Sequence, residues 1–285
     1  MRSLLLMKKE NTTSFGMHRH NIIQKQLSFF FTPYKIFRKY VIIHCASQYP
    51  ENTKEKIRSK ENMIYCLALI GFLLQIAFIR VEKKGNMKLA LILKTVAAVV
   101  FVMVGLLSVL HTKNPQHGWI VVCGLSCCAV GDFLLNYQFL KENPEPWFVA
   151  GAFANLVGHV LFISSLLPFD GTQLQKTLLI CGVLAVLLNI YIHVSIKAGL
   201  GLRIFGIVYI TALIFITVHT GVMYYFNPAN TGALIMSIGA GLFTFSDVLL
   251  IFDAFGNKKE WMRAADLVTY YLGQLFIAYS VFWFI

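Results

Sequence analysis

The chain has 285 residues, of which 57% are hydrophobic and only 13% charged, and its mean hydropathy is +0.66. Soluble domains carry roughly 25% charged residues, so this composition excludes an ordinary soluble protein and indicates a polytopic membrane protein. The formal net charge is +12. Basic residues beside apolar segments ordinarily set topology and meet anionic lipid headgroups, and the chain has neither zinc-finger spacing nor an RNA-binding motif. Membrane lipid is therefore an expected partner, and nucleic acid is not.

Residues 1–62 are basic, irregular and rich in asparagine, serine and lysine. The opening stretch "RSLLLMKKE" has too short an apolar core for a signal peptide. We predict a poorly ordered N-terminal extension over residues 1–62 and assign it no function.

Residues 63–285 predict a second region, an eight-helix transmembrane domain, because apolar segments of roughly 20 residues alternate there with short polar loops. The loops contain helix breakers, as in "KNPQHG" and "FNPANTG". The apolar segments lack the alternation of a membrane β-barrel. The predicted fold class is all-α, a polytopic membrane bundle of about eight transmembrane helices near 63–80, 89–110, 118–138, 147–169, 174–196, 204–226, 232–252 and 264–285.

The six cysteines do not indicate a disulfide or a metal site. Five of them lie in apolar segments, where cysteine behaves as a small hydrophobic residue. The stretch "CGLSCC" lacks the spacing of redox and zinc motifs. We therefore expect no metal and no cofactor.

The sequence also resembles itself at one constant offset. Asp132 and Asp247 each begin an Asp-x-Leu-Leu stretch and lie 115 positions apart (247 − 132). The same offset relates further positions in corresponding predicted helices, namely Gly124 with Gly239, Gly158 with Gly273, His159 with Gln274, and Lys94 with Tyr209. A four-plus-four internal repeat is the simplest account, with both halves in the same orientation.

Polar residues gather near one membrane face in this arrangement. At a rise of 1.5 Å per residue, Asp132 and Asp247 lie about 8–9 Å below that face, and Lys94 enters at a similar depth. Ionisable residues in hydrocarbon cost about 2.5–3.5 kcal/mol each and usually mark function. We predict Asp132 and Asp247 as catalytic residues. Residues predicted to bind substrate or tune the aspartates are Lys94, Asn155, His159, Tyr209, Tyr270 and Gln274. The alternative is a buried ion pair that only holds helices together.

Five stretches together resemble the YhhN-type family of integral membrane proteins, which includes the animal lysoplasmalogenases. They are "KTVAAVV", "GDFLL", "FANLVGHVLF", "GAGLFTFSDVLLIFDAF" and "LVTYYLGQLFIAYS". The resemblance covers about residues 63–285. By motif, Asp132 and Asp247 match the two aspartates of the family and Lys94 matches its lysine. Thr95 departs from the family, in which many members have proline after that lysine.

The resemblance implies an activity and a location. Characterised animal members hydrolyse the vinyl ether of lysoplasmalogens, releasing a fatty aldehyde and glycerophosphoethanolamine or glycerophosphocholine. The implied partners are a lysophospholipid substrate and water, and the implied location is the endoplasmic reticulum if the organism is eukaryotic. The sequence indicates neither the oligomeric state nor the preferred headgroup.

Vinyl-ether hydrolysis suits two carboxyl groups, because one must protonate carbon while the other faces a developing cation, as in glycosidases. The sequence leaves open which aspartate is the acid. The alternative functions are a proton-coupled transporter and a non-catalytic lipid-binding membrane protein. An intramembrane aspartyl protease is disfavoured, because the second motif is Ser-Asp and no Pro-Ala-Leu motif is present.

Overall fold

Eight long α-helices account for most of the chain that the computed structural model describes, which comprises residues 51–169, 173–196, 199–256 and 260–285. They are α2 (Glu51–Lys83), α3 (Met87–Val109), α4 (Pro115–Tyr137), α5 (Glu145–Leu166), α6 (Leu174–Ser195), α7 (Leu200–Phe226), α8 (Thr231–Phe255) and α9 (Glu260–Trp283). Short 3₁₀ turns follow α4 and α5, at Gln138–Leu140 and Leu167–Phe169. No strand occurs among the described residues, which confirms the predicted all-α class.

The chain divides into two units, residues 1–59 and residues 60–285. The second unit contains the bundle. Most of the predicted N-terminal extension, residues 1–50, lies outside the described residues, so the boundary at residue 62 stays a prediction. The helix α2 begins at Glu51, earlier than the predicted start at residue 63, because its first turns are polar and carry no apolar signal.

Seven of the eight helices, α2 to α8, are long and apolar enough to cross a membrane. The exception is α9, which has 24 residues but includes Asp266, Gln274 and several tyrosines. These polar side chains are buried against other helices. The apolar average of α9 is therefore low because the helix faces the bundle interior rather than lipid.

Local sequence explains where several helices begin. The side chains of Asn86 and Asn230 accept hydrogen bonds from the backbone N–H groups of Leu89 and Ala233, which caps α3 and α8. Proline occupies the first turn of α4, where its missing N–H has no intrahelical partner to lose.

Glycine pairs bring two helix couples into close contact. A Cβ atom built on Gly124 would lie 3.0 Å from the carbonyl oxygen of Gly158, so α4 and α5 approach closely only because both residues are glycine. A Cβ atom on Gly239 would lie 2.9 Å from the carbonyl oxygen of Gly273, where α8 crosses α9. Small residues permit this contact between membrane helices. Because the two pairs are related by the offset of 115, the same helix packing occurs twice.

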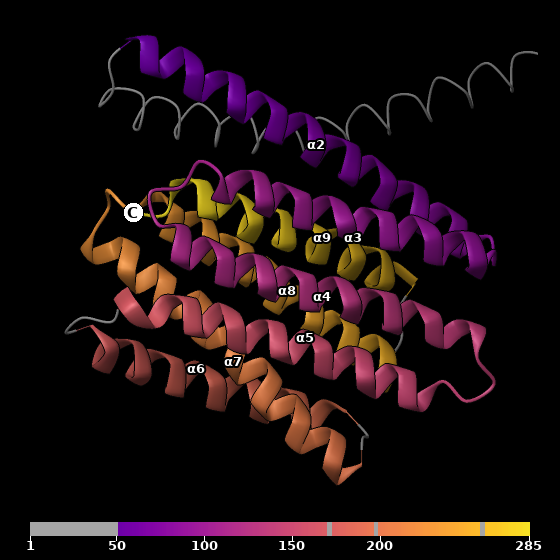
Figure 1. The fold of residues 1–285 in the computed structure, drawn as a ribbon. Coiled ribbons are helices and arrows are strands. Elements are labelled where there is room, and N and C mark those ends of the chain that lie inside the picture. Colours follow the sequence, from indigo (N-terminus) through magenta and orange to yellow (C-terminus); the bar gives the residue numbers. More distant parts are fainter. Residues whose placement is uncertain (1–50, 170–172, 197–198, 257–259) are drawn as a thin grey trace, which may run out of the picture. The chain divides into compact units, whose positions relative to one another are not determined.

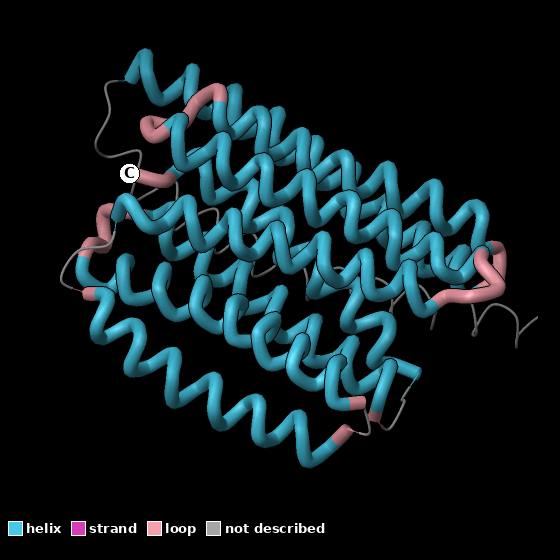
Figure 2. The backbone as a smooth tube through the Cα atoms, turned by 60° about the horizontal axis from the view of Figure 1, so that its bottom comes forward, coloured by secondary structure: helices cyan, strands magenta, loops and turns pink. Residues whose placement is uncertain are grey.

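The two halves, α2 to α5 and α6 to α9, also contact each other. The helix α3 packs against α9, and α7 packs against α5 (Figure 1). Within each half, α3 packs against α4 and α7 packs against α8. Figure 2 shows these helices running alongside one another, with the connecting loops at their ends. The contacts among α3, α4 and α5 therefore match those among α7, α8 and α9, and side chains from both halves face one another at the junction.

Candidate functional site

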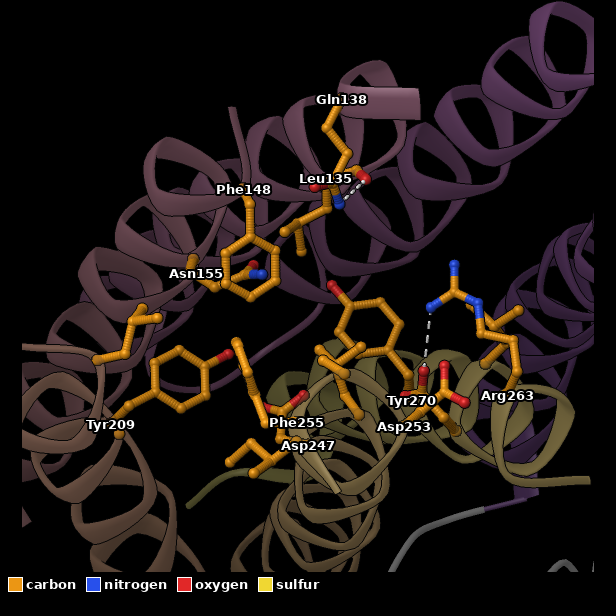
Figure 3. A pocket seen from close by; sticks show the side chains of 18 of the residues that line it. Leu135, Gln138, Phe148, Asn155, Tyr209, Asp247, Asp253, Phe255, Arg263 and Tyr270 are labelled. Carbon is orange, nitrogen blue, oxygen red and sulfur yellow. Dashed lines mark hydrogen bonds and ion pairs between the residues drawn. The ribbon is translucent and has the colours of Figure 1, made fainter. Parts of the chain in front are cut away.

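A cavity of about 600 Å³ lies where the two halves meet. Its lining comes from α2 to α9 and includes both aspartates, Asp132 and Asp247. Figure 3 shows the hydroxyl groups of Tyr209 and Tyr270 pointing into this space from α7 and α9. The structure thus brings the two carboxyl groups to one shared cavity.

The lining repeats with the same offset as the sequence. Pairs of lining positions separated by 115 residues include Lys94 with Tyr209, Asp132 with Asp247, Leu135 with Leu250, Gln138 with Asp253, Phe148 with Arg263, and Asn155 with Tyr270. Each half therefore supplies one wall from equivalent positions. The chemistry of the two walls differs, because most of the paired positions carry different residue types.

Asp132 forms an ion pair with the lysine of its own half. The Nζ atom of Lys94 lies 3.3 Å from Oδ2 of Asp132, and both side chains are almost completely buried. The same Nζ lies 4.4 Å from the centre of the Tyr270 ring, which adds a cation–π contact from α9. The Tyr270 hydroxyl also interacts favourably with the Asp132 carboxylate. Two interactions thus stabilise the positive charge of Lys94, and that charge stabilises the carboxylate.

Asp247 has different neighbours. The Tyr209 hydroxyl faces the Asp247 carboxyl group. The Asp266 carboxylate, on α9, repels a negative charge on Asp247. The Oδ2 atom of Asp247 is buried and makes no hydrogen bond to another described group. Within the described residues, no lysine or arginine lies within ion-pair distance of Asp247. A buried carboxyl group without a cation beside it favours its neutral form, because ionising it would place an uncompensated charge in an apolar medium.

Two predicted site residues lie behind the cavity wall instead of in it. His159 is fully buried, and its ring packs edge-on against Tyr209 and Phe243, at centroid distances of 4.8 Å and 4.9 Å. Gln274 is also fully buried, and its Nε2 donates to the Tyr270 hydroxyl at 3.2 Å. Each therefore supports a tyrosine that faces an aspartate. Asn155 lines the cavity, and its buried Oδ1 accepts no hydrogen bond from the part of the chain that the structure describes.

A charged group on the rim was missed from the sequence. Arg263 contacts Glu82 of α2 at 2.8 Å and Asp266 at 3.4 Å, and Ser246 donates a 2.7 Å hydrogen bond to Asp266. All of these except Ser246 line the cavity. Asp266 is buried although it lies near the start of its helix. The spacing of Arg263 and Asp266 by three residues on one helix face was the available signal.

No group of three or more His, Cys, Asp or Glu side chains suited to hold a metal ion occurs in the described part of the chain. The polar groups that line the cavity include carboxyl, amine, guanidinium, imidazole, phenol and amide groups. The arrangement can donate and accept protons near an apolar wall.

The helices define this chain as an integral, multi-pass membrane protein. The sequence profile of the YhhN family matches residues 61–281, so the chain belongs to the YhhN family. This match covers all of the cavity-lining residues.

Curated relatives are similar over part of the chain. The lysoplasmalogenase TMEM86B of Mus musculus is 30% identical over 165 residues, which is 57% of this chain and 63% of the relative. The protein of the same name from Rattus norvegicus is 29% identical over 168 residues, which is 58% of this chain and 62% of the relative. The chain thus spans less than two thirds of the length of these relatives. No solved structure matches it.

Proposed function

We propose that this protein is a membrane ether hydrolase that cleaves the vinyl-ether bond of lysoplasmalogens. The products are a fatty aldehyde and glycerophosphoethanolamine or glycerophosphocholine. The observation that carries the proposal is the placement of Asp132 and Asp247 in one cavity with different electrostatic surroundings. The names of the two curated relatives support the same reaction class.

The two aspartates have separate roles in this proposal. Asp247 carries the proton, since it is buried without a neighbouring cation in the described chain. Asp132 is the charged carboxylate, because Lys94 balances it at 3.3 Å. Pairs of carboxyl groups whose surroundings separate their protonation states are typical of acid–base catalysis.

The reaction begins when Asp247 transfers its proton to the β-carbon of the vinyl ether, which leaves an oxocarbenium ion. The Asp132 carboxylate faces this cation and stabilises it. Water then adds to the cationic carbon and gives up a proton, forming a hemiacetal. The hemiacetal collapses to the aldehyde and the alcohol, and a proton returns to Asp247. One water molecule is consumed, and the proposed chemistry needs no metal or other cofactor.

The remaining residues shape the cavity for a single-chain lipid. Tyr209, Tyr270 and Asn155 offer hydrogen bonds beside the carboxyl groups, and leucine and phenylalanine side chains supply apolar wall. His159 and Gln274 hold the two tyrosines from behind. The substrate headgroup lies toward the membrane face that is nearer to the aspartates. This placement brings the ether bond to the aspartates, because the ether bond of a lysophospholipid is close to its headgroup.

The test incubates the purified protein with lysophospholipids that differ only in the linkage of the chain: vinyl ether, alkyl ether or acyl ester. We expect free aldehyde from the vinyl ether alone. The Asp132→Asn and Asp247→Asn variants should each lose that activity while remaining in the membrane. Aldehyde release by either variant at the normal rate removes that aspartate from the mechanism.

Proton-coupled flux across vesicles without turnover of the vinyl ether would favour a transporter instead. We further propose that the protein resides in the endoplasmic reticulum if its organism is eukaryotic. Imaging of the tagged protein beside a reticulum marker tests this location.

A further inference from the structure

We propose that Asp253 binds the positively charged amine of the substrate headgroup, so that the cavity selects amine-bearing lysoplasmalogens. This inference rests on the proposed function, because it assigns one end of the proposed substrate. Asp253 lines the same cavity as the catalytic aspartates and lies near the carboxyl end of α8 (Figure 3).

The corner of the cavity around Asp253 contains Glu82, Arg263 and Asp266. One guanidinium, that of Arg263, faces three carboxylates: Glu82 at 2.8 Å, Asp266 at 3.4 Å, and Asp253 through a longer electrostatic interaction. Arg263 therefore has its ion-pair partners in Glu82 and Asp266. Asp253, in contrast, has no ion pair of its own among the described residues, so its carboxylate can bind a further cation.

The Oδ1 atom of Asp253 is buried and has no hydrogen-bond partner in the described chain. Burying a polar atom without a hydrogen bond is unfavourable, so an acceptor held in this way suits a donor that arrives with a ligand. An ammonium group supplies that donor together with the complementary charge. The corner is also aromatic, since Phe148 and Phe255 line the cavity and pack edge-to-face at 6.1 Å. Aromatic faces attract ammonium groups, including quaternary ones.

The spacing along α8 matches the substrate. Asp253 follows Asp247 by six residues (253 − 247), which corresponds to about 9 Å along the helix. A glycerophosphoethanolamine group that is not fully extended spans a similar length between its ether oxygen and its nitrogen. With the vinyl ether at Asp247, the amine therefore reaches Asp253. The position equivalent to Asp253 in the first half is the neutral Gln138, so only one of the two walls offers this charge.

The experiment compares kcat/KM for two vinyl-ether substrates, alkenyl-glycerophosphoethanolamine and alkenyl-glycerophosphate, which has no amine. We expect Asp253→Asn to lower the preference for the amine-bearing substrate by about tenfold or more, the usual effect of losing a hydrogen bond to a charged group. Turnover of alkenyl-glycerophosphate should be nearly unchanged, which also reports an intact fold. Asp253→Glu should keep most of the preference, and the matched control Gln138→Ala should keep all of it.

For a choline-bearing substrate, Asp253→Asn should lower kcat/KM less than for the ethanolamine-bearing one. The choline nitrogen has no hydrogen to donate to Oδ1 of Asp253. An equal effect of Asp253→Asn on both substrates, or no effect on either, overturns the inference. Binding of the non-hydrolysable alkyl-ether analogues, with and without the amine, provides the same comparison without turnover. If the wild-type protein releases no aldehyde, the proposed reaction fails, and these binding measurements still decide whether Asp253 recognises the amine.

Discussion

The two halves of this bundle use the same helix packing but surround their aspartates differently. In the first half, Asp132 pairs with Lys94. In the second half, tyrosine stands at the position equivalent to that lysine, and Asp247 faces the Tyr209 hydroxyl instead. Replacing a cation by a phenol removes the group that would keep the carboxylate charged. A repeated scaffold can thus give two identical side chains different chemistry through one neighbour.

A second difference lies where α4 crosses α5 in the first half and where α8 crosses α9 in the second half. Gly131 meets Gly151 in the first half, where a Cβ on Gly131 would lie 2.9 Å from the Gly151 carbonyl oxygen. At the equivalent positions of the second half, Ser246 donates a hydrogen bond to Asp266. The second half therefore has a hydrogen bond where the first half has a close contact between glycines. This hydrogen bond holds the Asp266 carboxylate at the cavity.

The largest effect is expected from removing Asp247, the proposed proton donor. Asp247→Asn should lower kcat for vinyl-ether hydrolysis by about 10³-fold, within the range attributed to general acid catalysis. Aldehyde formation from the purified variant measures this effect, with Gln138→Ala as a neutral control in the same cavity. Near-normal kcat in Asp247→Asn would contradict the assigned difference between the two aspartates.

The ion pair of the first half can be broken from one side. Lys94→Met leaves Asp132 buried without its cation, and removing one partner of a buried pair typically destabilises a protein by about 3–5 kcal/mol. The unfolding midpoint of the detergent-purified protein should fall markedly. The double variant Lys94→Met/Asp132→Asn should regain most of the stability but no activity. A single variant as stable as the wild type would show that the pair contributes little.

The repeated glycine crossings should respond alike to substitution. Gly239→Ala and Gly124→Ala each place a Cβ against neighbouring backbone or side-chain atoms, and such overpacking costs about 1–3 kcal/mol. Gly182→Ala is the control, because its added Cβ would meet no atom outside its own stretch of helix within 4 Å. Thermal unfolding of the three variants measures the effect. Unequal responses at the two crossings would mean that the halves pack less similarly than their sequences indicate.

The smallest effect concerns the hydrogen bond between Ser246 and Asp266 in the second half. Ser246→Ala removes the 2.7 Å hydrogen bond to Asp266 and should cost about 1 kcal/mol, the typical net contribution of one hydrogen bond. Ser164→Ala is a suitable control, since its hydroxyl donates a hydrogen bond to the carbonyl of Leu161 on its own helix. The unfolding midpoints of the two variants measure the difference. Equal midpoints would show that the hydrogen bond between Ser246 and Asp266 adds no stability of its own.

Much of the fold was predictable because each helix carries a continuous apolar signal bounded by breakers. The weak point was α9, whose buried Asp266, Gln274 and tyrosines lower its hydropathy, yet the sequence interval was still recognised as a helix. The start of α2 was placed late, since polar helical turns before residue 63 look like an extension.

The site was predictable to the extent that the offset of 115 pairs Asp132 with Asp247. The difference between the aspartates was not, because it depends on which side chains from other helices face each carboxyl group. Lys94 could be matched to Asp132 by depth, whereas the placement of His159 behind Tyr209 depends on helix rotation, which apolar runs do not specify. Asp253 and Arg263 lie near the ends of their helices, where sequence alone suggests solvation.

The crossed contacts of α3 with α9 and of α7 with α5 have an evolutionary consequence. A polypeptide of half this length would carry one aspartate and one open wall, and could close the cavity only as a homodimer around a two-fold axis. Such a dimer would force both carboxyl groups into identical surroundings. Joining the copies in one gene releases that symmetry, so each aspartate can specialise without altering the other.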